Sequence, residues 1–361
     1  MSTLTVSTQM KNRMMTPRAA INAMFVFVPI AVLGEQLGLG PVALFVAAAL
    51  SCVPLSYWLG QATEALGDRL GPVSVGLLNA TFCNAAELII SVMAISHGLF
   101  VVVRTSLVGS VLGQLLLVLG TSLLLAGIKH GKLRFSQSLT QVNFTLMAIA
   151  LVALGLPSIL LATTSDEGRG SVSFLSPTLA VLLIIIYSSS VLFTLRGQPS
   201  EDDASADGPE WSPAMGLVVL AAATGGMIVI SETLVGSIEG FIEETGMSEV
   251  FLGLILIPIF SNVVDHIVAI TVALKNRMDL SLTVSVGSAA QVACLVIPTI
   301  VLISTFTGQS GEIIFASVEL VAMAVGLLMI VPVLLDGRSN WLEGAQLLTV
   351  YTILGTVLWV I

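Results

Sequence analysis

Long apolar segments recur along most of the chain, from about residue 20 onwards. Each has about twenty residues or more, which is enough for an α-helix to cross the ~30 Å hydrocarbon core of a bilayer. Their apolar positions are continuous rather than alternating, so the pattern predicts helices and not the strands of a membrane β-barrel. We expect about eleven transmembrane helices, over residues 20–38, 41–63, 72–96, 100–126, 140–163, 172–195, 213–234, 249–274, 281–308, 313–335 and 340–361.

The composition indicates an all-α integral membrane protein. Of the 361 residues, 56% are hydrophobic and 10% are charged, whereas an ordinary soluble domain is roughly a quarter charged. The formal net charge is −9, and basic residues cluster only in short loops, which argues against nucleic acid as a partner. An inorganic cation and the lipid bilayer are the expected partners, and a homo-oligomer stays open.

The basic residues predict the orientation. If the N-terminus is cytoplasmic, Arg104 and Arg169 fall outside, and the inside holds Lys11, Arg13, Arg18, Arg69, Lys129, Lys132, Arg134, Arg196, Lys275, Arg277 and Arg338. This bias satisfies the positive-inside rule. The apolar run after Arg18 is too long for the h-region of a signal peptide, so we expect the first span to be retained. A prokaryotic plasma (inner) membrane is the expected location, with an organellar membrane left open.

Cysteine usage points to no cofactor. Cys52, Cys83 and Cys294 are widely spaced in apolar runs and form no CxxC pair. The pattern therefore predicts neither a disulfide framework nor a zinc site.

One polar segment interrupts the series of apolar segments. Residues 196–211, "RGQPSEDDASADGPEW", have the composition of a solvated linker, and an acidic calcium sensor at 201–210 is the alternative. This segment divides the chain into an N-terminal tail and first helix (1–40), a first repeat (41–196), the linker (197–212) and a second repeat (213–361).

The two halves share a spaced motif. Asn84 and Glu87 in "NAAE" recur as Asn262 and Asp265 in "NVVDH", each 178 residues further along, and the pairs Gly109-Ser110 and Gly287-Ser288 keep the same offset. The offset relates helices two to six to helices seven to eleven. Because five helices per half is an odd number, the repeats must be inverted in the membrane, as in secondary transporters with a midplane site.

The repeated residues predict a cation site. Three-residue spacing puts each asparagine and its carboxylate on one helix face. Together the candidate ligands are Glu87, Asp265, Asn84, Asn262, Ser110, Ser288, Gln114 and Gln291. All of them offer oxygen atoms, which suit a hard cation such as Ca²⁺. Interhelical hydrogen bonding is the structural alternative, and it is stronger for the serines and glutamines.

Two carboxylates without a basic partner require an occupant. Each charge at a helix centre costs roughly 2.5–3.5 kcal/mol on insertion scales. The pair Glu87 and Asp265 should therefore hold either a cation or protons, which is the physical basis of cation/proton exchange. Gly76, Gly109, Gly113 and Gly287 would permit close contact or unwinding, and Pro258 would kink the eighth helix and free a carbonyl near residue 254.

At these residues the chain resembles the calcium/proton antiporters of the calcium:cation antiporter superfamily. The similar segments are "GLLNATFCNAAELII", "SLVGSVLGQLLLVLG", "SNVVDHIVAITVALKNRMDLSLTVSVGSAAQ", "ELVAM" and "DGRSNWLEGAQLL". The resemblance implies an eleven-helix fold, a site at the two carboxylates and their polar neighbours, an acidic stretch between halves and a functional histidine at His266. Proton coupling would fall on Glu87, Asp265 and His266, with a structural histidine as the alternative.

The motifs depart from the family pattern in four places. Cys83 and Ser261 stand where glycine is usual, Asp265 where glutamate is usual and Gln114 where asparagine is usual. A thiol at the site would favour a softer metal than calcium. Outside the motifs, Glu319 corresponds to Gln141 by the offset and is expected to serve either structural bonding or a proton path.

The predicted function is a secondary active antiporter that exports Ca²⁺ in exchange for H⁺, and not an enzyme. Exchange of Mn²⁺, Na⁺ or K⁺ and sodium-coupled calcium exchange are alternatives within the same class, and a cation channel is the alternative from another class. An intramembrane enzyme would need a nucleophile and base or a metal cluster, whereas the three histidines are dispersed.

Overall fold

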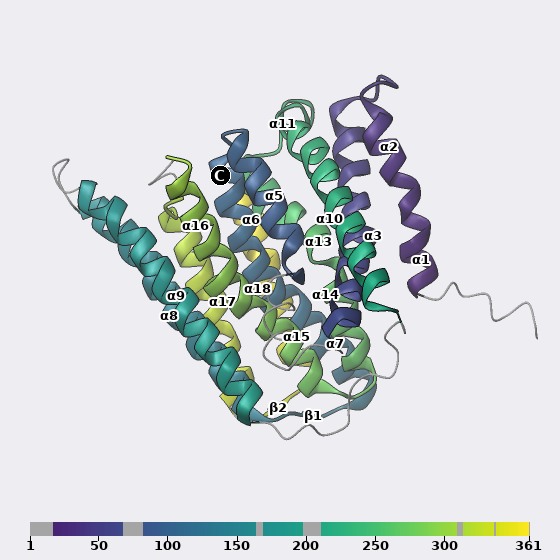
Figure 1. Cartoon of the computed structure of the whole chain (residues 1–361). Helices are drawn as coiled ribbons and strands as arrows, with labels where there is room; N and C mark the ends of the chain where they lie inside the picture. The colour runs from purple at the N-terminus through teal and green to yellow at the C-terminus, as the bar shows by residue number, and fades with distance from the viewer. Residues whose placement is uncertain are drawn as a thin grey trace, which may run out of the picture.

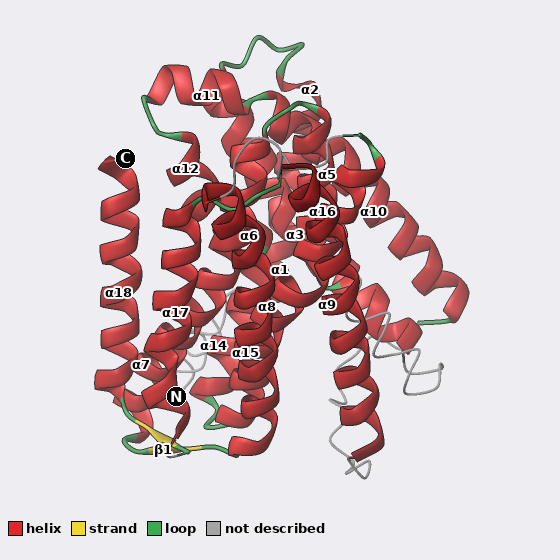
Figure 2. Ribbon diagram, turned by 90° about the vertical axis from the view of Figure 1, so that its left-hand side faces the viewer, coloured by secondary structure: helices red, strands yellow, loops and turns green. Residues whose placement is uncertain are grey.

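The computed structural model describes residues 17–67, 82–163, 169–197, 211–308, 313–335 and 337–360. Within these ranges the chain is helical apart from one short strand pair (Figures 1 and 2). The first half contains α1 (Pro17–Ala23), η2 (Met24–Val26), α2 (Phe27–Gly34), α3 (Pro41–Gly67), α5 (Ala85–Ser96), α6 (Phe100–Leu112), η3 (Gly113–Val118), α7 (Leu119–His130), β1 (Leu133–Arg134), α8 (Gln137–Thr163) and α9 (Arg169–Gly197). The second half contains α10 (Pro213–Gly236), α11 (Ile238–Thr245), α12 (Glu249–Phe251), η5 (Leu252–Leu256), α13 (Ile257–Ser261), α14 (Val263–Leu274), α15 (Met278–Gln291), η6 (Val292–Val296), α16 (Ile297–Phe306), α17 (Ser317–Leu335), β2 (Arg338–Ser339) and α18 (Trp341–Val360).

The protein is an all-α integral membrane protein. Eight helices in the described part of the chain are long and apolar enough to cross a membrane, and a bent pair that joins Glu249–Ser261 to Val263–Leu274 adds a ninth. Two shorter apolar helices cover Arg18–Gly34 and Ala85–Ser96. Each predicted range overlaps one of these segments. The count of eleven stays a prediction, because most of the first half of the 72–96 range lies outside the described residues.

The most buried helices form the centre of the bundle. In the helix Phe100–His130, 72% of the most apolar 18-residue segment is buried inside the protein, and in Met278–Phe306 the share is 61%. In Phe174–Thr194 it is 17%. In Figure 1, α8 and α9 lie along one edge of the bundle and α1 and α2 along the opposite edge. Four of the candidate ligands, Ser110, Gln114, Ser288 and Gln291, therefore lie on the innermost helices, away from lipid.

Three π-helical turns interrupt these central helices. They are η3 within the α6–α7 helix, η5 before α13 and η6 within the α15–α16 helix. A π-turn widens the helix locally and is frequent at functional sites. Pro258 does lie at a disturbed helix, as predicted, although the irregularity takes the form of η5 and a 62° bend at Asn262 rather than a simple proline kink.

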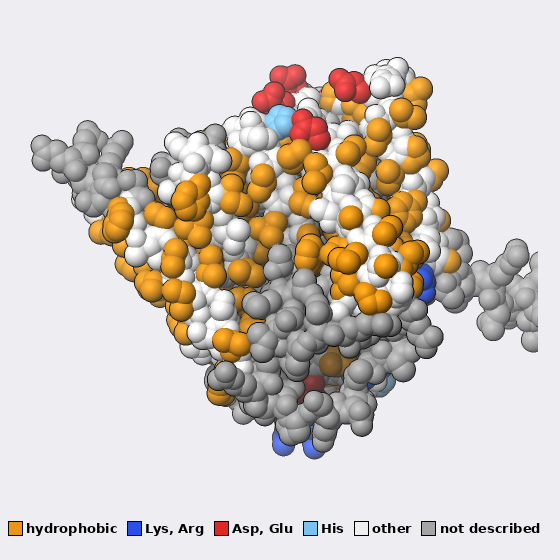
Figure 3. All heavy atoms as spheres, in the orientation of Figure 1, with side chains coloured by type: hydrophobic (Ala, Val, Ile, Leu, Met, Phe, Trp, Pro, Cys, Tyr) orange, Lys and Arg blue, Asp and Glu red, His pale blue; other side chains and the backbone are white. Residues whose placement is uncertain are grey.

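Charge separates the two ends of the bundle. Figure 3 shows acidic side chains and a histidine at the end that carries α11, and basic side chains at the end that carries β1 and β2. The strands β1 and β2 pair antiparallel, with Leu133 opposite Ser339 and Arg134 opposite Arg338. This short ribbon joins the loop after α7 to the loop before α18 at the basic end.

Glycines let α7 and α18 approach closely. A Cβ atom on Gly344 would lie 2.6 Å from the carbonyl oxygen of Gly120 and would also clash with the backbone of Leu124, and one on Gly127 would lie 2.7 Å from the Cα of Trp341. Small residues at such crossings allow the backbone contact that drives helix association in lipid. Gly109 has the same role at the site, because its Cβ would meet the backbone of Leu254.

The α7–α18 contact predicts a stability effect. Gly344→Ala should destabilise the protein by ~1–3 kcal/mol, because rigid backbone atoms must move to admit the methyl group. The measurement is thermal unfolding of the purified protein in detergent. Gly60→Ala is the control, since a Cβ at Gly60 meets nothing within 4 Å, and it should leave the unfolding temperature unchanged or raise it. Equal unfolding temperatures for the two variants would contradict the close contact.

Candidate functional site

Two helix breaks place the predicted ligands. Asn84 precedes α5 with φ −105° and ψ 17°, and Asn262 precedes α14 with φ −103° and ψ 10°. Neither residue is helical, and each is followed by a carboxylate in the first turn, Glu87 and Asp265. The positive end of a helix dipole stabilises such a carboxylate by typically 0.3–1 kcal/mol and at most about 2. This is less than the ~2.5–3.5 kcal/mol cost of a charge at a membrane helix centre, so a bound partner must supply the rest.

Asp265 is held by donors from two other helices. Its Oδ2 atom accepts a hydrogen bond from Gln114 Nε2 at 3.3 Å and one from Ser288 Oγ at 3.0 Å. Gln114 lies in the π-turn η3 and Ser288 near the end of α15. The carboxylate is thus oriented by residues that lie 151 and 23 positions away in the chain.

The remaining predicted ligands also bond to one another. Asn84 Nδ2 donates to Gln291 Oε1 at 2.9 Å. Asn262 Nδ2 donates to Ser110 Oγ at 3.0 Å and to Ser261 Oγ at 3.2 Å. Each asparagine therefore bonds to a residue from the other half of the chain. The amide nitrogens are engaged in these bonds, which leaves the carbonyl oxygens of the asparagines as candidate cation ligands.

Glu87 differs from Asp265. Its side chain is 5% exposed, and neither carboxylate oxygen accepts a hydrogen bond of good geometry from any residue that the structure describes. Ser261 and Asn262 are its polar neighbours, and Asp265 is close enough to interact electrostatically. A buried acceptor without a donor is costly, and a cation or a proton on the carboxyl group would satisfy it.

The donor set fits a hard cation better than a transition metal. Amide and hydroxyl groups surround the two carboxylates, and the oxygen atoms of such groups are ligands that Ca²⁺ prefers. In the described part of the chain no group of three or more histidine, cysteine, aspartate and glutamate residues lies together. Three hydrogen-bonded groups hold seven of the eight predicted ligands: Asp265 with Gln114 and Ser288, Asn262 with Ser110, and Asn84 with Gln291. The eighth, Glu87, lies near Asn262 and Asp265.

The other predicted positions lie around this cluster. His266 is half-buried, and its imidazole ring makes no hydrogen bond or ion pair with any described residue, whereas its backbone N–H donates to the carbonyl oxygen of Asn262 at 3.1 Å. Glu319, 2% exposed, accepts a bond from the Ala316 amide at 2.8 Å and lies 3.7 Å from Arg104 Nε. The Arg104 side chain is 21% exposed, because α6 packs against α17, and its position on the outer side of the membrane stays a prediction. Gln141, the counterpart of Glu319, is exposed.

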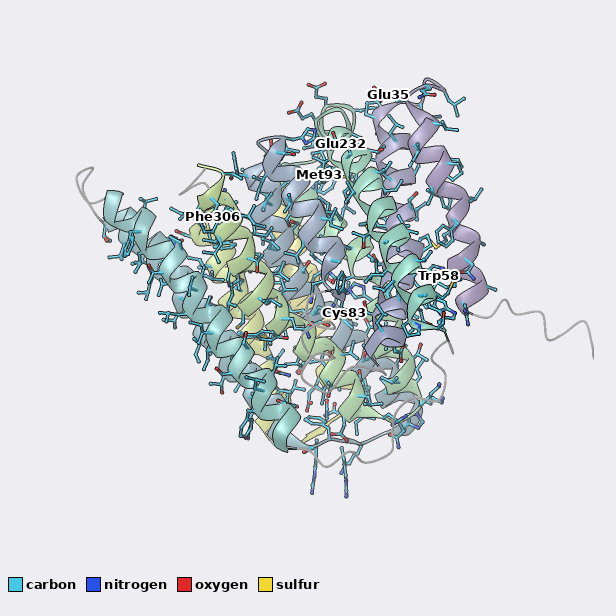
Figure 4. The ribbon with its side chains drawn as sticks, in the orientation of Figure 1. Glu35, Trp58, Cys83, Met93, Glu232 and Phe306 are labelled. Atoms are coloured by element: carbon cyan, nitrogen blue, oxygen red, sulfur yellow. The ribbon has the colours of Figure 1, made fainter. Side chains whose placement is uncertain are left out.

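Cys83, one of the departures from the family pattern, lies near the start of a described range. Cys83 is exposed on the turn before Asn84, so its side chain is not wedged into a helix contact. Its place below Met93 along α5 is visible in Figure 4. Gly76 and the acidic linker 201–210 lie outside the described residues.

One polar residue of this cluster was not predicted from the sequence. Tyr187 on α9 is 6% exposed, and its hydroxyl group is hydrogen-bonded to the side chain of Gln291. Gln291 Oε1 also accepts a hydrogen bond from Asn84, so Gln291 links Tyr187 to Asn84. The repeated motif does not include Tyr187, because this tyrosine has no counterpart 178 residues away in the chain. Its only signal was a single tyrosine in an apolar helix.

Comparison with known proteins identifies the family. The sequence profile of the sodium/calcium exchanger protein family matches residues 40–196 and 215–360. The chain belongs to this family. The matched ranges contain every predicted ligand and leave out the whole of the linker 197–212.

Relatives of this sodium/calcium exchanger family member span nearly its whole length. A Ca(2+)/H(+) antiporter from Aphanothece halophytica is 37% identical over 350 residues, which cover 92% of this chain and 94% of the relative. The Ca(2+)/H(+) antiporter ChaA of Bacillus subtilis is 38% identical over 335 residues, which cover 91% and 95%.

Solved structures of the exchanger family share the fold. The structure of native YfkE aligns with a TM-score of 0.80 at 35% identity and covers 94% of this chain and all of that one. The H+/Ca2+ exchanger CAX aligns with a TM-score of 0.75 and covers 94% of this chain and 91% of that one. At 16% identity the second match supports the fold alone.

The contact between Tyr187 and Gln291 predicts an effect on cation affinity. Tyr187→Phe should release Gln291 and so weaken the restraint on Asn84, which should raise the apparent KM for the transported cation about threefold to tenfold with little change in maximal rate. Tyr351→Phe is the control, because the Tyr351 hydroxyl is buried without a partner among the described residues. Matching kinetics for both variants would exclude a positioning role for Tyr187.

Proposed function

We propose that the protein is a secondary active antiporter that moves Ca²⁺ in exchange for H⁺ at the carboxyl groups of Glu87 and Asp265. The observation that carries the proposal is the meeting of two carboxylates from two broken helices inside one cluster of amide and hydroxyl oxygens. Relatives named Ca(2+)/H(+) antiporters that match nearly the full chain support it.

The exchange follows from charge neutrality. The empty pair carries charge that the low-dielectric interior disfavours. Two positive charges on one calcium ion neutralise both carboxylates, and so do protons on the carboxyl groups, but the two occupants compete for the same oxygens. Either neutral state can pass through an occluded conformation, whereas the empty charged site resists closure. Transport in one direction is thereby tied to counter-transport in the other.

Alternating access is supported by the repeated breaks. Discontinuous helices that carry a ligand at the break are the usual device by which inverted-repeat transporters expose one site to two sides. The pairs Asn84 with Glu87 and Asn262 with Asp265 have nearly the same backbone angles, and η3 and η6 begin close to equivalent positions. These matches favour the inverted repeat predicted from the sequence.

The distribution of charge supports a cytoplasmic N-terminus in a plasma membrane. The basic end with β1 and β2 would face the cytoplasm and the acidic end with α11 the outside. In this orientation the protein exports calcium. The exposed acidic residues on α10, α11 and α12 would raise the local cation concentration at the outer mouth.

Three rival functions remain as alternatives. Sodium-coupled exchange, which the family description includes, would use the same oxygen donors. A transition-metal exchanger would draw on the thiol of Cys83 as a soft ligand. A channel would pass current without a counter-ion.

Transport by reconstituted protein tests the proposal. Liposomes that contain the purified protein should take up ⁴⁵Ca²⁺ when a proton gradient is imposed, and the uptake should collapse when an ionophore dissipates the gradient. A sodium gradient should not replace the proton gradient, and Mn²⁺ should compete more weakly than Ca²⁺. Calcium uptake that ignores the proton gradient would refute the antiport mechanism.

Neutral isosteres test the two carboxyl groups. Glu87→Gln and Asp265→Asn should each lower the initial rate of proton-driven calcium uptake at least about 100-fold, equivalent to ~2.7 kcal/mol, because a neutral amide cannot exchange a proton for a cation. Glu35→Gln, which changes an exposed carboxylate, is the matched control and should keep the wild-type rate. A Glu87 or Asp265 variant that is folded and transports normally would contradict the site assignment.

A further inference from the structure

A small cavity adjoins Glu87 on the side of the acidic end. It offers about 10 Å³ of room for the centre of a water-sized molecule, which is about the space that one buried water needs. Its polar lining is the Glu87 carboxyl group and four serines, Ser91, Ser106, Ser110 and Ser261. A polar cavity of this size with several hydrogen-bonding groups is suited to hold a water molecule.

Helix periodicity arranges the lining in two levels. Residues four apart lie on one helix face, one turn from each other. Glu87 and Ser91 are so related on α5, and Ser110 and Ser106 on α6. Glu87, Ser110 and Ser261 form the level of the cation cluster, and Ser91 and Ser106 form the next level. Figure 4 shows that α5 rises from Cys83 towards Met93 and the acidic end, so the second level lies on that side of Glu87.

The rest of the lining closes the cavity to a larger guest. Ile90, Leu107 and Ile257 are buried at 3%, 1% and 3% exposure. Calcium takes about six to eight oxygen ligands, whereas two of the hydroxyl groups are already engaged: Ser110 accepts from Asn262 and Ser106 donates to the carbonyl oxygen of Val103 at 3.0 Å. The space admits one water molecule and excludes a hydrated cation.

The second half of the chain has no serines at the positions equivalent to Ser91 and Ser106. The counterparts of Ser91 and Ser106 at the 178-residue offset are Ala269 and Val284. Ala269 is fully buried, so helix packing at this point does not require a hydroxyl group. The two carboxyl groups thus differ in their surroundings: Asp265 accepts two hydrogen bonds, and Glu87 faces a hydroxyl-lined cavity.

We infer that Ser91 and Ser106, with one water molecule between them and Glu87, form a proton-conducting step that serves Glu87 from the acidic end and that the cation does not use. The inference rests on the proposed function. In each transfer a hydroxyl group or the water accepts one proton as it donates another, so that one proton reaches the Glu87 carboxylate and no other bond changes. Ser91 lies six residues before His97, the exposed cap of α5, which is a rise of about 9 Å.

Such a step acts as a size filter. After the cation has left, the opening at the acidic end can narrow until only a water-sized passage remains. Protons still reach Glu87 through this passage, whereas the cation cannot return. Ile90, Leu107 and Ile257 complete the lining and are themselves buried, and such apolar walls would limit proton leakage. The serines would therefore bias the exchange without contributing to cation binding.

Calcium/calcium exchange and proton-driven calcium uptake, measured side by side, distinguish a role of the serines in proton transfer from a role in cation binding. Calcium/calcium exchange across liposomes, with ⁴⁵Ca²⁺ on one side and no pH gradient, needs no proton transfer, whereas proton-driven uptake does. The double variant Ser91→Ala/Ser106→Ala should lower proton-driven uptake about tenfold or more and keep calcium/calcium exchange within about twofold of wild type. Its proton-driven uptake should also slow more than that of wild type when H₂O is replaced by D₂O.

Ser122→Ala is the matched control, because Ser122 is fully buried on α7 and does not line this cavity. It should leave both modes unchanged. An equal loss in both modes for the double variant would assign the serines to cation binding or packing, and unchanged proton-driven uptake would also overturn the inference. Failure of the proposed function gives a different result, since wild-type protein would then show no proton-driven uptake at all.

Discussion

The structure depends on two carboxylates, Glu87 and Asp265, that lie inside a membrane protein and form no ion pair with any lysine or arginine in the described ranges. Helix dipoles offset part of the cost of their charge, because each begins a helix, but dipoles of this kind contribute less than burial costs. The difference must come from something bound. A cation or protons in the site would supply it, and this requirement is the physical basis of the exchange proposed above.

Helix breaks make the arrangement possible. At Asn84 and Asn262 the chain leaves the helical conformation, so that polar side-chain groups meet inside the helix bundle, where they bond across the two halves. Irregular backbone is tolerated at this depth because it is enclosed by the central helices and not exposed to lipid. The π-turns at η3 and η6 sit beside these breaks, and glycines such as Gly109 bring the neighbouring helices into backbone contact.

The two halves are alike in backbone and different in chemistry. Asp265 is fixed by Gln114 and Ser288, whereas Glu87 has no donor of good geometry among the described residues and adjoins a water-sized cavity. The two copies of the motif therefore present a more restrained carboxylate and a less restrained one. A transporter that handles two substrates at one site gains from this inequality, since one carboxylate can be specialised for the cation and the other for proton entry.

Apolar periodicity by itself determined the fold class, and the 178-residue offset singled out the ligands, because helix formation and motif spacing are local properties of the chain. The sequence could not show which donor bonds to which acceptor. Only the packing of α6, α9 and α15 decided that Gln114 holds Asp265, that Tyr187 reaches Gln291 and that Arg104 is buried against Glu319. Those contacts join residues far apart in the chain, and their geometry depends on helix crossings that no local pattern encodes.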